Sequence, residues 1–500
     1  MRRGLDGTDL SPGRFAALFA VLYATAAVPV ARTLILPLVD YPNHLARMAL
    51  LARLPHDPAL GRFYALAWRP IPDLAMDLLV PPLLRVLPLA TAGRVFVLLA
   101  FLLIAGGAAL LYRVLFGRWS AWAALAFLLL YNRLLLWGLL NDLFGLGLAL
   151  VALALSIALR GRGIALRLVA GTVVAFALYF AHLMAFGVFA VLWLGCEAGF
   201  VWRERGAGIL RLCVAVLPLL LPAGLMLASG TGEGGMPHFA PPWRKLDLLF
   251  SVFDLYHRPF DVACFAVAVL GLGLAYWRRW LVVAPPLGLP LALLGLAYLA
   301  MPTDIAGATG VDRRLPLALA LVLAGGSTWV APRPRLERAY LAAAAVMFLL
   351  RLGTVAASWE ASDRAYRALL AGLDAIPRGS LVAVAYPPAA LNVSATPLAH
   401  FAVLAAARRD AFVPTLFARP TQQPVVLRPP FRALADRTSP DRLWAAFAAG
   451  TLTPAAVGPY DVIVLAGVAP IAAADPAGFI PLFRAPRFRI YRIARPAGAS

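Results

Sequence analysis

The sequence predicts an α-helical polytopic membrane protein with about eleven transmembrane helices, followed by a small α/β domain. Apolar residues make up 62% of the 500 positions and charged residues only 14%. The mean hydropathy of +0.81 is higher than a water-soluble domain of this size needs for its core. After Trp359 the long apolar runs stop, so the chain divides into a membrane domain, residues 1–359, and a C-terminal domain, residues 360–500.

The net charge of +21 comes almost entirely from arginine, with Lys245 the single lysine. In a chain this apolar, the excess does not indicate a nucleic-acid partner, and we expect none. The three cysteines, Cys196, Cys213 and Cys264, all lie inside apolar runs. Neither a disulfide framework nor a thiolate metal site is therefore expected.

Arginines predict the orientation of the spans, because short loops that carry positive charge stay in the cytoplasm. Arg2, Arg3 and Arg14 precede the first apolar run, which places the N-terminus inside and Asp40 at the outer face. Each later span alternates direction, which places residue 360 and the C-terminal domain outside. After the first span, the expected spans are residues 91–112, 119–140, 143–159, 165–181, 183–201, 209–228, 261–277, 281–301, 315–330 and 339–358.

Two long segments are expected on the outer side. Residues 40–90 form the first outer loop, and the run Leu74–Leu89 within it predicts a helix lying at the membrane interface, because Asp73, Asp77 and Arg85 interrupt its apolar character. Residues 229–260 form the second long loop. Its glycine-rich start predicts a mobile lid, although a long solvated loop has the same composition.

The acidic residues provide a check, because they were not used to thread the chain. Most of them fall on the expected outer side, which indicates a polar outer surface, although longer outer loops also hold more of everything polar. These residues are Asp40, Asp57, Asp73, Asp77, Asp142, Glu233, Asp247, Asp254, Asp261, Asp304 and Asp312.

The C-terminal domain contains short β-like stretches between helical segments. Strands are expected at Leu381–Tyr386, Val462–Ala466 and Phe488–Ile493, and a helix at Ala361–Leu373. Prolines cluster between these segments, which argues against a continuous helical bundle.

Asp40-Tyr41-Pro42-Asn43-His44 follows the first span at the membrane face. Asp40 and His44 are four residues apart, so a helix that begins near Pro42 would place them near one face, and either could act as a general base. The alternative is that Asp40 only caps that helix.

Further polar residues are expected at the outer face. Asp73 and Asp77 repeat the spacing of four and could bind a cation or sugar hydroxyls, unless one caps the helix and the other faces water. Asp142 lies between two apolar helices with almost no loop, where polar residues usually have a function. Within the preceding span, Arg133 could form a structural ion pair or bind phosphate.

Two histidines and two arginines complete the candidate set. His182 falls at an outer turn, where a packing role is the commoner one, and His238 lies in the second outer loop. Arg313 and Arg314 form the strongest basic cluster beside an outer span end, suited either to a lipid-linked phosphate or to anionic lipid headgroups. The chain lacks a Walker-type phosphate loop, a His-Glu-x-x-His zinc helix and a Gly-x-Ser-x-Gly nucleophile elbow.

This layout resembles the GT-C superfamily of polytopic membrane glycosyltransferases, which use a sugar linked to a lipid phosphate. The match rests on an acid in the first outer loop, Asp40, on the amphipathic segment after it, on Asp142 at a later outer turn, and on an outer domain after the last span. The chain departs from many members, which carry two neighbouring acids in the first loop, and it lacks the Trp-Trp-Asp-Tyr-Gly signature of oligosaccharyltransferases. That departure leaves both the metal requirement and the acceptor open.

The resemblance implies an inverting glycosyltransferase of a bacterial inner membrane, which takes a sugar from a polyprenyl-phosphate donor on the periplasmic side. Asp40 would be the base, and His44 and Asp142 would orient it or help to bind a cation. If a divalent metal ion is present, Asp40 and Asp142 would be its acidic ligands. Arg313 and Arg314 would neutralise the leaving phosphate, while Asp73, Asp77, His182 and His238 would contact substrate. The acceptor, whether glycan, lipid or protein, stays unnamed.

Two other classes of function remain open from the sequence. A transporter or flippase for a lipid-linked or anionic substrate would place charged residues near mid-membrane in several spans and would show symmetry between halves. A non-catalytic membrane subunit of an envelope assembly would use its outer domain to bind a partner.

Overall fold

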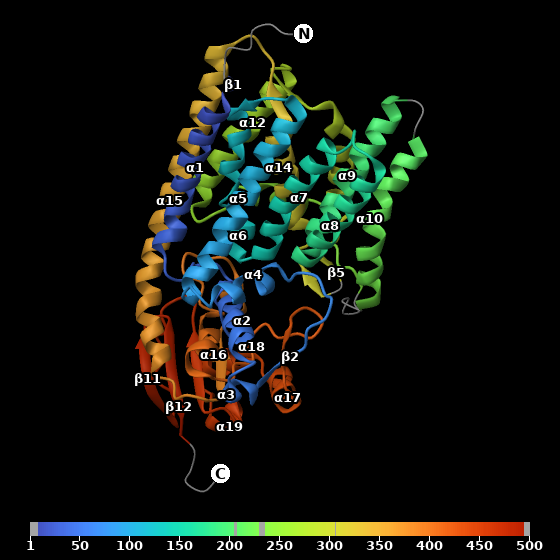
Figure 1. Cartoon of the computed structure of the whole chain (residues 1–500). Coiled ribbons are helices and arrows are strands. Elements are labelled where there is room, and N and C mark those ends of the chain that lie inside the picture. The colour runs from blue at the N-terminus through green and yellow to red at the C-terminus, as the bar shows by residue number, and fades with distance from the viewer. Residues whose placement is uncertain (1–8, 205–207, 230–235, 306, 495–500) are drawn as a thin grey trace.

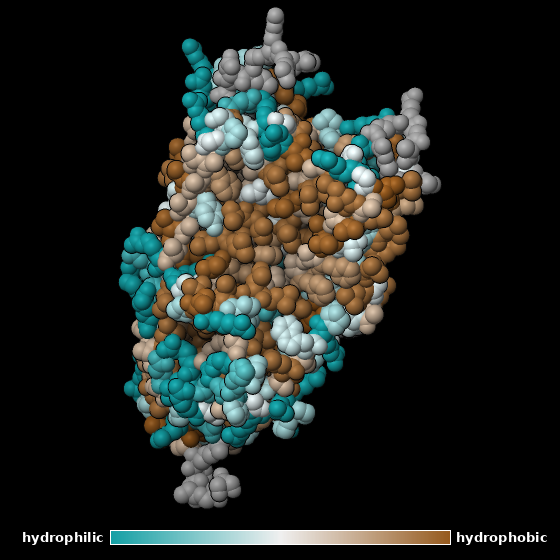
Figure 2. Space-filling view, in the orientation of Figure 1, coloured by the Kyte–Doolittle hydropathy of each residue, from teal (hydrophilic) through white to brown (hydrophobic). Residues whose placement is uncertain are grey.

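The computed structural model describes residues 9–204, 208–229, 236–305 and 307–494. Within these ranges, eight helices are long and apolar enough to cross a membrane, and the protein is a multi-pass membrane protein. They are α1 (Pro12–Arg32), α5 (Leu89–Phe116), α7 (Leu140–Ala158), α8 (Ile164–Ala181), α9 (Leu183–Glu204), α10 (Gly208–Ser229), α12 (Arg258–Trp277) and α15 (Pro334–Asp374). On the face seen in Figure 2, an apolar band lies between two more polar ends.

The other three expected spans are not continuous helices. Residues 119–140 contain the 3-10 helix η1 (Ala121–Leu129) and the short helix α6 (Arg133–Trp137). The remaining two contain α13 (Gly288–Ala300) and α14 (Leu315–Gly326), whose runs also include the paired strands β4 (Leu281–Val283) and β7 (Ser327–Trp329). Pro285 and Pro286 stand at the break before α13, and Gly326 ends α14, which explains these two interruptions. The count of about eleven spans stays a prediction.

Helix α15 joins the two parts of the molecule. Its 41 residues span roughly 60 Å at 1.5 Å per residue, about twice the hydrocarbon thickness. The helix therefore continues beyond the membrane region and packs against the C-terminal sheet (Figure 1). The boundary expected after Trp359 and the separate helix expected at Ala361–Leu373 both fall inside this one helix.

The C-terminal region contains a four-stranded sheet in the order β11-β12-β10-β8. The three expected strands are confirmed as β8 (Val382–Ala385), β10 (Val462–Ala466) and β12 (Phe488–Ile493). The sequence analysis missed the edge strand β11 (Phe479–Ala485), because it contains Pro481 and a register shift, which only an edge position tolerates. Strand β10 runs parallel to β8 and antiparallel to β12.

The first outer loop and the C-terminal region are packed together. The loop contains α2 (Tyr41–Arg53), α3 (Pro58–Gly61), β2 (Tyr64–Leu66) and α4 (Ala75–Leu83). Strand β2 pairs with β9 (Val425–Leu427), and α2 contacts α16 (Leu404–Arg409). In Figure 1 the loop lies among the C-terminal elements, at the opposite end of the molecule from the start of α1. Residues 40–66 and the C-terminal region thus form one structural unit.

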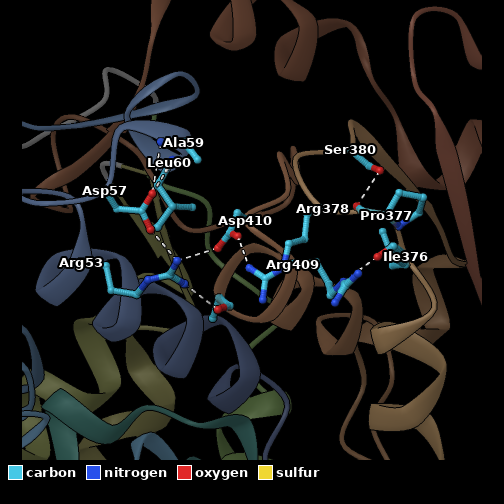
Figure 3. A network of polar contacts seen from close by, with 11 residues as sticks. Arg53, Asp57, Ala59, Leu60, Ile376, Pro377, Arg378, Ser380, Arg409 and Asp410 are labelled. Atoms are coloured by element: carbon cyan, nitrogen blue, oxygen red, sulfur yellow. Dashed lines mark hydrogen bonds and ion pairs between the residues drawn. The ribbon is translucent and has the colours of Figure 1, made fainter.

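A network of ion pairs closes this interface (Figure 3). One guanidinium nitrogen of Arg53 lies 2.5 Å from Asp57 and 2.6 Å from Asp410, and Arg378 adds a second contact of 2.5 Å to Asp410. Asp57 also caps α3 by accepting hydrogen bonds from the Ala59 and Leu60 backbone amides. Charged groups therefore hold the end of α2 against the segment that follows α16.

Candidate functional site

Asp40 stands at the start of α2, where the chain has just left the membrane region. Its backbone N–H donates to the Trp137 carbonyl at 3.0 Å, while its carboxylate makes no capping hydrogen bond to the helix. The capping alternative is therefore not realised by the side chain. Burial raises the pKa of Asp40 to about 7, against an opposing effect of Arg47. A carboxyl group with this pKa can exchange a proton near neutral pH.

The short segment between α6 and α7 holds Asp40 in place. Gly138 ends α6 with φ of +90°, a conformation that suits glycine, and a Cβ at this position would lie 3.0 Å from both the Cβ and the backbone nitrogen of Asp40. Asn132 caps α6 by accepting from the Leu135 N–H. The residue type at 138 therefore controls how closely this segment approaches Asp40.

His44 lies one turn after Asp40 but does not share its surroundings. Its Nε2 lies 3.0 Å from the Gly138 carbonyl oxygen, and burial lowers its pKa to about 3, so the ring is neutral and Nε2 carries the proton. Among the described contacts, none joins the His44 ring to the Asp40 carboxylate. His44 therefore links α2 to the turn at Gly138 through this hydrogen bond.

The C-terminal region contributes a different histidine to Asp40. His400 Nε2 lies 3.4 Å from Asp40 Oδ1, and the two side chains are 8% and 19% exposed. The Asn43 side chain, also from α2, contacts His400 Nδ1 at 3.1 Å. Sequence analysis did not find His400, because it lies 360 positions from Asp40 in a stretch without a motif.

Asp73 and Asp77 do not form the expected pair. Asp73 precedes α4 with φ of +67°, so the two are not one turn apart on a helix. Both oxygens of Asp77 accept hydrogen bonds from Arg47, at 2.8 and 2.9 Å, and its side chain is 1% exposed. The expectation that Asp77 contacts substrate is corrected: it forms a buried ion pair between α2 and α4.

Asp142, His182 and Arg314 come together from three separate turns. Asp142 Oδ1 lies 3.1 Å from His182 Nδ1, and Arg314 Nη1 lies 2.9 Å from His182 Nε2. A guanidinium only donates hydrogen bonds, so His182 Nε2 accepts and Nδ1 carries the proton toward Asp142. Asp73 Oδ1 lies 3.6 Å from the same Nε2 atom and accepts from the Leu183 N–H. His182 therefore links Asp142 to Arg314, whereas Asp73 lies near the accepting Nε2 atom without a hydrogen bond to it.

Arg313 lies close to the Asp40 turn. Its guanidinium carbon is 5.4 Å from the centre of the Trp137 ring, and the carbonyl of that tryptophan holds Asp40. Arg133, which faced two alternatives in the sequence, lies 3.3 Å from Asp254 and contacts the Leu255 carbonyl, so it forms an ion pair. Arg313 has no such acid among the described residues, so no carboxylate there neutralises its charge.

Several buried polar atoms in this layer have no protein partner among the described residues. They include Trp137 Nε1, Asp142 Oδ2, Arg313 Nε and Arg314 Nε, and also Asp142 Oδ1 and His182 Nδ1, which face each other at 3.1 Å without an aligned hydrogen bond. Buried polar atoms without partners are uncommon in proteins and usually have an explanation. Their gathering beside two guanidiniums is consistent with a site that receives a polar, anionic group.

His238 lies elsewhere. Its exposed ring contacts Asp304 at 3.0 Å, and its backbone pairs with the same residue. None of its described contacts reaches the Asp40 or Asp142 turns. Residues 230–235, the glycine-rich start of the expected lid, lie outside the described residues, whereas residues 236–260 are described and contain the helix α11 (Arg244–Phe250).

A resident divalent metal ion is not supported by the side chains found here. Within the described ranges, no three His, Cys, Asp or Glu side chains are arranged to hold an ion. Asp40 contacts a histidine, and Asp142 is engaged by His182. Asp40 and Asp142, the two acids that the sequence offered for a metal, therefore do not make a fitting donor set together.

Two solved structures are similar to this chain over nearly its full length. Both are of ArnT from Cupriavidus metallidurans. The one bound to undecaprenyl phosphate gives a TM-score of 0.55 at 14% identity, covering 97% of this chain and 100% of that chain. The one in the apo state gives 0.55 at 14%, covering 96% and 98%.

Neither a protein-family model nor a curated protein sequence matches this chain. The structural similarity covers both the membrane helices and the C-terminal region. The resemblance to the GT-C superfamily that the sequence indicated is therefore confirmed at the level of the fold.

Proposed function

We propose that this chain is a glycosyltransferase of a bacterial inner membrane, which moves one sugar from a polyprenyl-phosphate carrier to an acceptor on the periplasmic side. The N-terminus would be cytoplasmic, and the C-terminal region and the Asp40 site periplasmic. The fold shared with ArnT, which has been solved bound to undecaprenyl phosphate, supports this class of donor. The observation that carries the proposal is the Asp40 carboxyl group, which is only 19% exposed and faces His400 at 3.4 Å, has a pKa raised to about 7 and has no direct ion pair with an arginine among the described residues.

Asp40 is the base in this proposal. A base works best when its pKa lies near the operating pH, because it is then ionised in part and still accepts a proton readily. Arg47 is close enough to favour the ionised form of Asp40, but its hydrogen bonds go to Asp77. Asp40 thus keeps a reactive carboxylate at the membrane face.

Arg313 and Arg314 hold the phosphate of the donor. Guanidiniums bind phosphate through paired N–H groups, and each of these two has a buried Nε without a protein partner. Arg314 contacts the His182 ring, which in turn contacts Asp142, and these contacts fix the position of Arg314. The guanidinium of Arg313 lies over the Trp137 ring. In this proposal the two guanidiniums stabilise the negative charge that develops as the phosphate leaves.

The reaction is a single displacement at the anomeric carbon of the sugar. The acceptor O–H bond breaks and its proton passes to Asp40, while the acceptor oxygen forms a bond to the anomeric carbon. The bond between that carbon and the phosphate oxygen breaks, and its electron pair leaves with the polyprenyl phosphate. Attack opposite the leaving group inverts the anomeric configuration.

The proposal is tested with the full chain purified in detergent with phospholipid. The probes are undecaprenyl phosphates carrying a ¹⁴C-labelled hexose, hexosamine or pentose, offered with a lipid and glycan extract of a bacterial envelope. Asp40→Asn is expected to lower transfer by about 10²- to 10⁴-fold, the usual contribution of a general base. Asp374→Asn, a change in an exposed carboxylate outside the site, is the matched control and should leave transfer unchanged.

Transfer by Asp40→Asn at the wild-type rate would remove Asp40 from the catalytic role. If wild-type protein transfers no labelled sugar but moves the labelled lipid between leaflets of a vesicle, the transporter alternative replaces this proposal.

A further inference from the structure

His400 brings the C-terminal region into direct contact with Asp40. It stands in the turn before the 3-10 helix η5 (Phe401–Val403), and its Nε2 faces Asp40 Oδ1 at 3.4 Å. No other ion pair or hydrogen bond of the Asp40 carboxylate is found in the described part of the chain. The contacts around His400 therefore determine whether an N–H group or a bare ring nitrogen faces the Asp40 carboxylate.

A chain of hydrogen bonds fixes the proton on the His400 ring. The Phe417 backbone N–H donates to Asn43 Oδ1 at 2.7 Å, so the Asn43 amide nitrogen must point the other way. That nitrogen lies 3.1 Å from the Thr415 carbonyl and 3.1 Å from His400 Nδ1. An amide nitrogen only donates, so Nδ1 accepts. A neutral ring with an accepting Nδ1 carries its proton on Nε2, and this N–H faces Asp40.

The ring is held in this state and orientation. Burial lowers the pKa of His400 to about 4, so the ring is neutral at pH 7 and does not compete with Asp40 for a proton. The Phe417 ring packs against it with centroids 5.3 Å apart, and the Tyr386 ring with centroids 6.4 Å apart. The imidazole therefore acts as a fixed N–H donor.

We propose that His400 is a positioning residue that holds the Asp40 carboxylate through its Nε2–H and makes the C-terminal region part of the catalytic site. This inference rests on the proposed role of Asp40 as the base. One carboxylate oxygen faces His400, which leaves the other for the acceptor hydroxyl. The 3.4 Å contact shortens when the acceptor binds, as catalytic hydrogen bonds often tighten only in the complex with substrate.

The packing between the two regions supports this role. Strand β2 is paired with β9, and Tyr64 accepts from the Val413 N–H and donates to the Ala411 carbonyl. Arg53 adds its contact to Asp410 close by (Figure 3). The segment 411–417, which includes the partners of Asn43, is thus attached to the first outer loop at several points.

Three variants of His400 separate positioning from packing. The amide nitrogen of Gln reaches the Nε2 position, whereas the shorter Asn side chain reaches only the Nδ1 position. Phe keeps the ring but has no nitrogen. With the labelled donor that wild-type protein turns over, His400→Asn and His400→Phe should lower kcat by about 10- to 30-fold with the donor KM within about twofold. His400→Gln should recover kcat to within about threefold of wild type.

Equal kcat in all three variants and wild type, with Asp40→Asn inactive, would overturn the role of His400 and leave the proposed function standing. A rise in KM without a change in kcat would overturn it as well. Wild-type transfer by Asp40→Asn would instead overturn the proposed function, and this inference with it.

A second measurement does not depend on turnover. The chain has six histidines, so ¹⁵N-histidine labelling of the full protein gives few signals, and the His400→Gln spectrum identifies the one that disappears. The ¹⁵N shifts should show a neutral ring protonated on Nε2 at pH 7. A ring protonated on Nδ1, or doubly protonated, would overturn the inference even if the variants lose activity.

Discussion

Asp40 and Asp77 are two carboxylates of the same outer loop, and both lie near Arg47, yet their contacts with this arginine differ. Asp77 accepts two hydrogen bonds from Arg47 and is sealed from solvent. Arg47 makes no hydrogen bond to Asp40 among the described contacts and lowers its pKa only through its charge, and the larger effect is burial, which raises the pKa. The guanidinium of Arg47 presents one pair of parallel N–H groups, and both go to Asp77, so Asp40 is left without an arginine ion pair among the described residues.

The comparison teaches that residue type and neighbourhood in sequence do not assign a role. Arg47 neutralises Asp77 at close range, so this carboxylate stabilises the packing of α2 on α4. Among the described residues, the Asp40 carboxylate contacts only the neutral N–H of His400, and in the proposed role this contact orients the carboxylate without neutralising it. Each prediction below tests this difference between the two acids.

The largest effect on stability is expected from Asp77→Asn. The change leaves Arg47 buried without its counter-ion, which typically costs about 3–5 kcal/mol when one partner of a buried pair is removed. Thermal unfolding of the full chain in detergent should show a clearly lower midpoint. Glu360→Gln, which breaks an exposed pair with Arg364, is the matched control and should change stability by no more than about 0.5 kcal/mol.

The double variant Arg47→Met/Asp77→Leu should regain most of the loss, because it removes both charges together. If Asp77→Asn unfolds at the same temperature as Glu360→Gln, the structural role of the pair is wrong.

Asp40→Asn should change the folding stability in the opposite direction to Asp77→Asn, because it should stabilise the protein. The folded protein holds the Asp40 proton up to about pH 7, whereas the unfolded chain releases it near the ordinary value of 3.8. The folded state therefore binds more protons between these values, and stability falls as pH rises through this window. Replacement by Asn removes that cost, by at most about 4 kcal/mol for a shift of three pKa units.

The measurement is the unfolding midpoint of Asp40→Asn and wild type at pH 4, 6 and 8. The variant should be the more stable protein at pH 8, and the difference should shrink toward zero at pH 4. A difference that does not change with pH would show that Asp40 is not a buried carboxyl group with a raised pKa.

The sequence predicted those features that depend on local patterns. Hydropathy and arginine spacing found the eight long helices, and alternation found β8, β10 and β12. Asp40, Asp142, His182 and Arg314 were all expected on one face. The prediction that Asp73 and Asp77 lie one turn apart on a helix was wrong, because Asp73 has a positive φ and lies before the helix.

The rest depends on contacts between distant segments. His400 reaches Asp40 because β2 pairs with β9 and α2 packs on α16, and no local pattern contains that information. The tautomer of His400 depends in turn on the Phe417 backbone amide through Asn43. Asn43 lies in the segment Asp40-Tyr41-Pro42-Asn43-His44 that the sequence analysis singled out, but only its partners from the C-terminal region reveal its role.

Asp410 is intermediate between Asp40 and Asp77, and gives the smallest expected effect. Burial alone would raise its pKa, but hydrogen bonds from Arg53 and Arg378 lower it, so the pair contributes stability above the ordinary carboxyl range that is lost as pH falls. Asp410 also has φ of +54°, which Asn tolerates, so Asp410→Asn tests charge without adding backbone strain. We expect a loss of about 1 kcal/mol at pH 7, since Arg53 and Arg378 are partly exposed.

The stabilities of Asp410→Asn and Arg378→Ala, measured by thermal unfolding at pH 7, separate the two arginines that share this carboxylate. Arg378 is 66% exposed and should matter less than Asp410, which also anchors Arg53 of the first outer loop. If the interface positions His400 on Asp40, Asp410→Asn should also lower kcat by about two- to threefold, whereas Arg378→Ala should not. Equal kcat in both variants would show that the Arg53 contact stabilises the docking without influencing Asp40.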